Sequence, residues 1–394
     1  MHSSAFHRAS RVKLTKMGLS FIGSSIATAA VGLLLSQVFL PSIAKPTLIV
    51  CTSLFVLTVF YFVLRVIYDS WRIRYIAFFS EGTQGATFYE TFFEHLIREA
   101  HGHSSNSKYE YVIFPWIADQ GHGKAKLGSL RRINHSGMIV WADQGIEVKD
   151  LVAHKVHSVL LDSISSQEGL PQHFMTIRVN HEVGGKSAGE AAVKYLEPLY
   201  KEKSVDPCIM VLTGRTSDRY SQHPTKAFCE VMRIKWGNVQ ISNASFDLLS
   251  SRDEARTFVY TELKNLSNRQ GAGKNRLPDL IFAASDDMAL GAREALRQYQ
   301  EEGRLRGLCE DYFTEENGGE RVPQIIGYGG TLEMFDLLRS DEEIYLLATV
   351  NSKVEEQAKN AWRALTGLLE GVRYRVPEIE MELKPRGWAY HQTH

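Results

Sequence analysis

Hydrophobic and polar positions divide the chain into an apolar head and a larger α/β part. Residues 17–40 contain no charged residue, and a second apolar run covers residues 47–64. From residue 74 onward, short apolar stretches alternate with segments whose apolar positions recur at helical spacing. This alternation predicts βα units that form mostly parallel sheets covered by helices on both faces.

The same pattern gives expected bounds for the elements of the α/β part. Strands are expected at residues 75–79, 109–114, 137–141, 158–161, 175–179, 209–212, 239–241, 279–283, 324–327 and 346–350. Helices are expected at residues 88–100, 184–196, 224–234, 255–266, 286–299, 332–338 and 354–369. Because ligands bind at the carboxyl ends of parallel strands, the loops that follow these strands are the expected place for a site.

The apolar head predicts two membrane-spanning helices. A helix over residues 17–40 rises about 36 Å, which is enough to cross a bilayer core with some tilt. The short link at residues 41–46 makes an antiparallel hairpin the expected arrangement, with residues 17–68 as the hairpin and residues 1–16 as a basic tail.

Positive charge flanks the outer ends of this hairpin, at Arg8, Arg11, Lys13 and Lys16 before it and at Arg65, Arg72 and Arg74 after it. Positive flanks stay cytoplasmic, so the pattern favours a two-pass inner-membrane protein whose large domain faces the cytoplasm. A cleaved signal peptide and a domain on the periplasmic face are the alternatives. Small residues in the first helix are compatible with homo-oligomer contacts through the hairpin.

Composition removes several function classes. The formal net charge is zero, so no nucleic-acid partner is expected. The four cysteines are scattered without metal-ligand spacing, so no metal is expected, although a Cys208–Cys229 disulfide stays open. No complete phosphate loop, GxSxG or HExxH motif occurs, so neither a cofactor nor an enzyme activity is expected.

Segments of the α/β part carry a family resemblance. They are Asn180–Gly189 with its Gly-Gly pair, Ile281–Ala292, Ile325–Thr331 and Leu347–Asn351. In this order and spacing they resemble the bacterial type I periplasmic binding proteins, the family of ribose-binding-protein-like sugar-binding domains. Ile281–Ala292 is the most specific of these matches.

The resemblance implies two Rossmann-like lobes within residues 74–390. Lobe 1 would comprise about 74–180 and 352–373, and lobe 2 about 181–351 and 377–390. The implied function is a membrane-anchored protein that binds or senses a sugar or sugar-like molecule by cleft closure. The alternatives are a tethered extracytoplasmic component of a sugar transporter, a cytoplasmic sensor of a nucleotide-like signal that acts through the hairpin, and an enzyme that borrowed the fold. The same domain occurs in lac-repressor-type regulators, but the hairpin occupies the place of their DNA-binding helices.

The resemblance also implies a set of ligand-binding residues. Phe88 and Tyr89 match paired aromatics that stack on a sugar ring, and packing in the first helix is the alternative for both. Asp162, Ser285, Asp286, Tyr328 and Asn351 match polar or aromatic positions of the family's cleft. For Asp162 the alternative is a turn, and for Ser285 and Asp286 it is helix capping.

Two family positions differ in this chain. Pro224 stands where the family has an arginine, with Arg215 and Arg219 nearby, and Gly329 stands where the family has an acid. With fewer carboxylates and two arginines, the site could suit an anionic or nucleotide-like ligand rather than a plain pentose.

Overall fold

The computed structural model describes most of the α/β part and a short piece of the head. The described residues are 57–62, 64–65, 73–80, 87–104, 109–117, 137–141, 151–153, 155–161, 170–201, 206–214, 219–246, 252–268, 277–303, 322–340, 342–372, 374 and 376–387.

The predicted hairpin falls mostly outside this range. Its first span and its connecting turn lie outside the described residues, and of the second span residues 57–62 and 64–65 are described and helical. In the described part of the chain, no helix combines the length and the apolar character that a membrane crossing needs.

The strands of the α/β part form two sheets. They are β1 (Ile73–Ser80), β2 (Glu110–Ile117), β3 (Gly137–Trp141), β4 (His157–Leu161), β5 (Phe174–Ile177), β6 (Cys208–Thr213), β7 (Gln240–Ser245), β8 (Leu280–Ala283), β9 (Gln324–Gly329), β10 (Leu346–Asn351) and β11 (Glu382–Pro385). The first sheet has the order β2-β1-β3-β4-β5, and the second has the order β11-β10-β9-β8-β6-β7. The registered pairs are parallel except β10 with β11, as the sequence pattern predicted.

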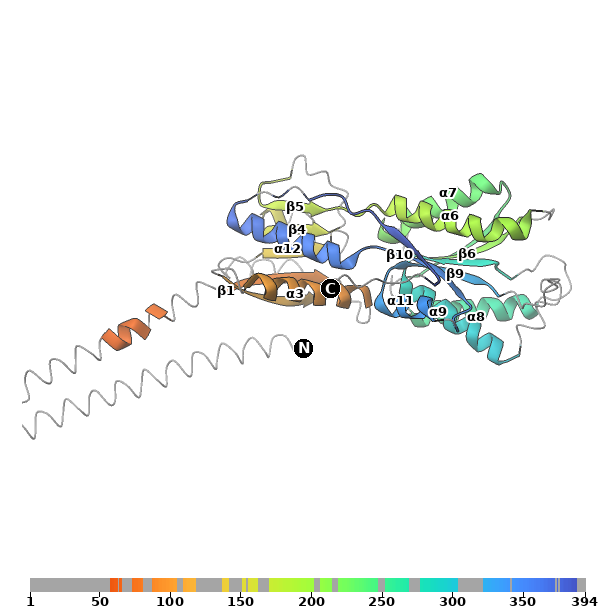
Figure 1. The fold of residues 1–394 in the computed structure, drawn as a ribbon, viewed down its shortest axis with the longest axis horizontal. Helices are drawn as coiled ribbons and strands as arrows, with labels where there is room; N and C mark the ends of the chain where they lie inside the picture. Colours follow the sequence, from red (N-terminus) through yellow and green to blue (C-terminus); the bar gives the residue numbers. More distant parts are fainter. Residues whose placement is uncertain are drawn as a thin grey trace, which may run out of the picture. The chain divides into compact units, whose positions relative to one another are not determined.

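Helices cover both faces of the second sheet (Figure 1). The described helices are α3 (Thr87–Ser104), α6 (His181–Tyr200), α7 (Arg219–Lys235), α8 (Arg252–Asn268), α9 (Asp286–Glu301), α11 (Leu332–Arg339) and α12 (Val354–Glu370). Helices α6 and α7 pack on one face of the second sheet, and α8, α9 and α11 pack on the other. Helices α3 and α12 cover one face of the first sheet, although α12 follows the second sheet in the chain. We call the first sheet with α3 and α12 lobe 1, and the second sheet with its helices lobe 2.

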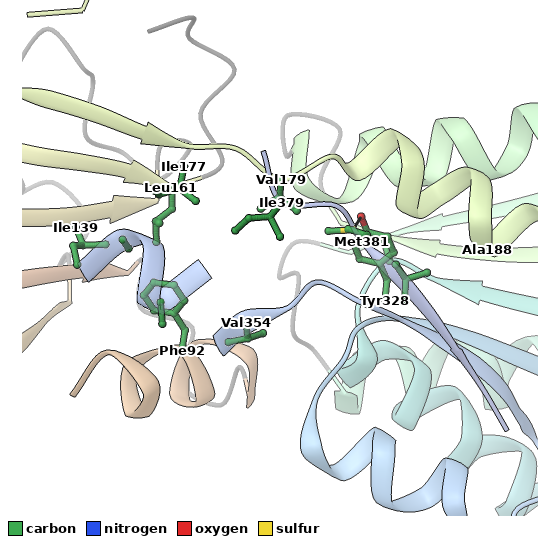
Figure 2. Packing of buried hydrophobic residues seen from close by; sticks show 14 of the residues in the cluster. Phe92, Ile139, Leu161, Ile177, Val179, Ala188, Tyr328, Val354, Ile379 and Met381 are labelled. Carbon is green, nitrogen blue, oxygen red and sulfur yellow. Dashed lines mark hydrogen bonds between the residues drawn. The ribbon is translucent and has the colours of Figure 1, made fainter. Parts of the chain in front are cut away.

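Three short segments connect the lobes. The first follows β5 at Ile177, the second follows β10 at Asn351, and the third includes Ile379. The first and third are paired, because the N–H of Asn180 donates to the carbonyl of Ile379 at 3.1 Å and the N–H of Ile379 donates to that of Arg178 at 2.9 Å. Figure 2 shows Val179 and Ile379 side by side at this crossing.

The buried core is continuous through the crossing. Phe92, Ile139 and Leu161 of lobe 1 belong to the same cluster of buried side chains as Ala188 and Tyr328 of lobe 2 (Figure 2). A continuous apolar contact couples the crossing to both sheets, since each crossing segment has neighbours in the core of each lobe.

Helix α6 begins three residues before the expected start. The Asn180 side chain caps it by accepting a hydrogen bond from the N–H of Val183 at 3.1 Å, which moves the start to His181. A Cβ on Gly185 would lie 2.3 Å from the Pro224 carbonyl oxygen, and one on Gly184 would lie 2.6 Å from the Met381 sulfur. These glycines therefore let α6 approach both α7 and the third crossing segment.

Helix α7 begins at Arg219 rather than at Pro224, so the loop between β6 and α7 is shorter than the sequence pattern predicted. Proline is favoured at a helix start, which is why the pattern placed the boundary there. Inside α7, Pro224 removes one backbone hydrogen bond near the first turn, and burial of Ala227 and Phe228 on the next turns stabilises the helix.

Candidate functional site

The carboxyl edge of the second sheet lies where the chain crosses between the lobes. Strands β6, β8, β9 and β10 end at Thr213, Ala283, Gly329 and Asn351, and the second crossing starts directly after Asn351. We call this set of strand ends, with the residues that follow each strand, the carboxyl edge. It is the position at which open α/β sheets bind ligands.

Asp286 fastens three parts of this edge together. Its carboxylate accepts a hydrogen bond from the N–H of Thr331 at 2.7 Å and one from the Thr349 hydroxyl at 2.6 Å. The side chain is 2% exposed, and burial raises the pKa of its carboxyl group above the ordinary value against the opposing effect of these hydrogen bonds. Asp286 therefore has a structural role between β8, β9 and β10, and a contact with ligand stays a prediction.

Ser285 caps the helix that follows β8. Its hydroxyl oxygen accepts a hydrogen bond from the N–H of Met288 at 3.2 Å, so the capping alternative is confirmed. Since a capping hydroxyl keeps its own proton as a donor, the cap leaves Ser285 able to donate to a ligand. Ser285 and Asp286 are thus adjacent in sequence but differ in what they can still offer.

Asn351 lies at the start of the second crossing. Its Oδ1 atom accepts a hydrogen bond from the N–H of Lys353 at 2.8 Å, and this lysine has a left-handed backbone with φ of 53°. Ser352 fixes the same segment to β9, because its hydroxyl donates to the Gly329 carbonyl at 2.6 Å. Gly330 has φ of 75°, and a Cβ there would lie 2.7 Å from Asn351 Oδ1, so only glycine fits.

Tyr328 is buried beneath the carboxyl edge. Its ring is 1% exposed, and its hydroxyl is 2.8 Å from Nδ1 of His181 and 2.6 Å from the Met381 sulfur. The ring thus packs at the crossing, as Figure 2 shows for Tyr328 and Met381. The contact of Tyr328 with a ligand stays a prediction.

The predicted aromatic pair lies at the start of α3. Tyr89 is partly buried and packs against the core cluster that includes Phe92, so the packing alternative accounts for the contacts seen. Phe88 lies in the first turn of α3, and the position of its side chain is outside the described part of the structure.

Three predicted ligand residues cannot be placed in the edge. Asp162 directly follows Leu161, where β4 ends, but Asp162 and Arg215 lie outside the described residues. Arg219 is the first residue of α7, and its side chain is also outside the described part. The prediction of an anionic ligand rests on these two arginines and stays a prediction.

Two polar residues at the edge were not among the predicted set. Gln222 on α7 donates through Nε2 to the Thr213 hydroxyl at 3.2 Å and to the Gly214 carbonyl at 3.1 Å, at the end of β6. His181 is the first residue of α6 and is linked to Tyr328. Each of these residues lies two or three positions before an expected helix start, and that position was the signal by which the sequence could have indicated them.

Metal and disulfide chemistry can be assessed for the described residues. No group of three or more His, Cys, Asp or Glu side chains in that part of the chain has the arrangement of a metal site. Cys208 and Cys229 are both free thiols, which answers the question that the sequence left open.

Comparisons with known proteins identify the fold. No known sequence family matches the chain, and no curated protein matches it in sequence. Solved structures do match. A Caulobacter myo-inositol binding protein bound to myo-inositol has a TM-score of 0.58 at 18% identity, over 80% of this chain and 93% of that one.

A solute binding protein of a Bacillus halodurans ABC transporter, with bound myo-inositol, has a TM-score of 0.60 at 16% identity, over 80% of this chain and 95% of that one. The trehalose repressor from Escherichia coli has a TM-score of 0.52 at 16% identity, over 79% of this chain and 99% of that one. At such identities, likeness is informative about fold and not about ligand. The α/β part of this chain has the two-lobed fold of the type I periplasmic binding proteins, with parallel sheets.

Proposed function

We propose that this protein is a receptor for a neutral sugar or cyclitol, which it binds at the carboxyl edge by closing its two lobes. The observation that carries the proposal is the chemistry of that edge. The described polar groups at or next to that edge include the hydroxyl of Ser285, the amides of Asn351 and Gln222, and the imidazole of His181. Hydroxyl, amide and imidazole groups both donate and accept hydrogen bonds, which suits the hydroxyls of a polyol.

Charge supports a neutral ligand. The carboxylate of Asp286 is buried and bonded to Thr331 and Thr349, and the neighbouring Asp287 is also buried. Gly329 offers no side chain where the family pattern would give an acid. Structures of the same fold that hold myo-inositol are consistent with this chemistry.

The crossing segments support a closing motion. The first and third segments are joined by backbone hydrogen bonds at Ile379, and the second contains a left-handed Lys353. A hinge of a few residues at element ends is the usual basis of domain closure around a ligand. The ligand would favour the closed state by contacting both lobes, to the extent that it binds that state more tightly.

The proposal includes a membrane location. Residues 17–40 and 47–64 are long apolar runs with basic flanks, which favours a two-pass anchor with the receptor domain in the cytoplasm. A reporter fused after His394 tests this. A reporter active only outside the cytoplasm would support a tethered component of a transporter instead of a cytoplasmic sensor.

Calorimetric titration of the full-length protein in detergent tests the ligand. We expect saturable binding of myo-inositol or a neutral hexose, and none of adenine or guanine nucleotides. Nucleotide binding without polyol binding would overturn the neutral class and would favour the anionic alternative suggested by Arg215 and Arg219.

A single substitution tests the location of the site. Asn351→Ala should weaken polyol binding by about tenfold or more, because it removes amide hydrogen bonds worth about 1.4 kcal/mol. Asn265→Ala on α8 is the matched control, since its amide bonds to Glu262 and not to the carboxyl edge. Equal affinity of Asn351→Ala and wild type, with both folded by thermal unfolding, would place the ligand elsewhere.

A further inference from the structure

The amino edge of the lobe 1 sheet gathers positively charged and imidazole side chains, whereas the carboxyl edge belongs to the lobe 2 sheet. We call Arg74, Lys155, His157 and His173 the basic edge. Arg74 and His157 lie at the beginnings of β1 and β4, Lys155 lies in the turn before β4, and His173 directly precedes β5.

Strand alternation puts three of these side chains on one face. Side chains two residues apart on a strand point to the same face of the sheet. Arg74 therefore shares a face with Ile76 and Phe78, His157 with Val159 and Leu161, and His173 with Met175 and Ile177. All of these apolar residues belong to the core under α12. Between β1 and β4, Gly137 pairs with Ile76 on one side and with His157 on the other. Gly137 has no side chain of its own, so β3 places none between Arg74 and His157 on this face. A Cβ there would lie 2.7 Å from Leu365 Cδ1, because Leu365 of α12 packs over this position.

Arg74 is a buried cation without a partner of opposite charge among the residues that the structure describes. It is 7% exposed, its guanidinium lies 3.9 Å from the centre of the Tyr109 ring, and its Nε atom is buried without a hydrogen-bond acceptor. No ion pair involves Arg74 in the part of the chain that the structure describes. A guanidinium has five N–H donors, and a buried one is normally paired because desolvation of an unpaired charge is unfavourable.

The two imidazoles add to the same imbalance. Their ring centres are 6.4 Å apart, and Nε2 of His173 is buried without a hydrogen-bond partner. Among the described residues, the charged groups that act on the two rings are Arg74, Lys155 and the neighbouring histidine, all of which oppose protonation. Burial is the largest cause of the lowered pKa values of both histidines.

A buried indole extends the row of donors. Trp362 on α12 is 1% exposed, and its Nε1–H has no acceptor in the described part of the chain. Its ring contacts Tyr111 at 4.8 Å between centres, and Tyr111 contacts Tyr109, the residue under Arg74, at 6.5 Å. Arg74 Nε and Trp362 Nε1 are donors, His173 Nε2 can become one, and among the described residues none of the three atoms has an acceptor.

We propose that the basic edge is a second binding site, which takes a phosphate group through Arg74, His157 and His173. A phosphate presents only acceptor oxygens, it pairs with a guanidinium through two parallel hydrogen bonds, and its remaining oxygens can reach imidazole donors. The group can belong to a soluble phosphate ester or to a phospholipid headgroup, since both offer the same oxygens. This site is separate from the proposed sugar site, because it lies at the amino ends of the lobe 1 strands, whereas the carboxyl edge is formed by the carboxyl ends of the lobe 2 strands.

The test compares three full-length proteins in detergent: wild type, Arg74→Met, and the matched control Arg363→Met, which removes an exposed arginine from α12. Thermal unfolding is followed with increasing inorganic phosphate, against sodium chloride at equal ionic strength. We expect phosphate to raise the midpoint saturably for wild type and Arg363→Met, as mass action requires for a ligand of the folded state. Arg74→Met should reduce the phosphate affinity by at least about tenfold.

Two further arms make the outcome decisive. Glycerol 3-phosphate and short-chain phosphatidylglycerol, used below its micelle concentration, distinguish a soluble ester from a lipid headgroup by which stabilises more strongly. If Arg74→Met does not fold, His173→Phe replaces it, because it keeps the ring packing on Phe174 and removes the nitrogens. Equal phosphate responses in wild type and the folded variant, or no saturable response in wild type, would overturn the proposal without affecting the sugar site.

Discussion

The amino edges of both sheets bury charged side chains, but the two edges differ in how those charges are paired. At the start of the second sheet, Asp279 is 6% exposed and accepts hydrogen bonds from the Tyr200 hydroxyl at 2.6 Å and from the Cys208 N–H at 2.8 Å. At the start of the first sheet, Arg74 is similarly buried, but its guanidinium contacts the aromatic ring of Tyr109. The buried charge of Asp279 is thus hydrogen-bonded within the fold, whereas that of Arg74 has no counter-charge among the described residues.

This difference teaches how to distinguish structural charges from functional ones. Asp286 at the carboxyl edge resembles Asp279, since its oxygens are taken by protein donors. A buried charge whose partners are in the chain stabilises the fold, and one whose partners are missing is a candidate for binding.

Removal of the paired charge should have the largest effect on stability. Asp279→Ala should lower the free energy of unfolding by about 3 kcal/mol, because it leaves the part-buried Cys208 N–H and the buried Tyr200 hydroxyl without the carboxylate to which they donate. Urea unfolding measures the change. Glu301→Ala, which removes an exposed carboxylate from α9, should change stability by less than about 0.5 kcal/mol, and equal losses would contradict the contrast.

The thiol beside Asp279 should be unreactive in the folded protein. Burial, and then the charge of Asp279, raise the pKa of Cys208 to about 11. At pH 8 its thiolate fraction is then about 100-fold below that of an ordinary thiol, so alkylation should be slower by at least roughly that factor. Iodoacetamide labelling in native buffer and in urea checks this, and similar rates in both would show that Cys208 is not held as described.

Removal of the unpaired charge should have a small effect of the opposite sign. In chloride buffer without phosphate, Arg74→Met should leave the free energy of unfolding unchanged or raise it by up to about 1 kcal/mol, because a buried charge is lost while the apolar chain is kept. The same urea experiment applies. A loss as large as that of Asp279→Ala would mean that Arg74 is paired within the fold.

The histidines of the basic edge should give the smallest effect, as a pH dependence of stability. The pKa values of His157 and His173 are lowered in the folded protein, chiefly by burial. The unfolded chain therefore takes up protons first, and their stabilising contribution, present above the ordinary histidine pKa of about 6.5, is lost as the pH falls below it. The decline from pH 7 to 5.5 should be shallower in a His157→Phe, His173→Phe double variant than in wild type, and identical slopes would exclude these two groups as its source.

Much of the fold could be predicted from local patterns. Alternation of apolar stretches predicted each βα unit from β1 to α12, because strand and helix periodicities are properties of neighbouring residues. The boundaries of α6 and α7 were misplaced by three and five residues, since the Asn180 cap and the tolerance of Pro224 depend on what packs around them. The candidate site was predicted through family resemblance, and that resemblance could not tell a bonded Asp286 from an available one.

The layered α/β architecture and the position of Ser285 as a helix cap could be predicted from the amino-acid sequence, because periodicity and capping act over a few residues. Only the tertiary structure decided that Asp286 and Asp279 are satisfied within the chain, since their donors come from residues far along it, such as Thr349 and Tyr200. In the sequence, Arg74 is an ordinary basic residue after an apolar run. The tertiary structure buries it against the Tyr109 ring beside imidazoles, without a counter-charge among the described residues. The reason is physical: whether a polar group is paired depends on distance in space, and a linear pattern does not contain that distance.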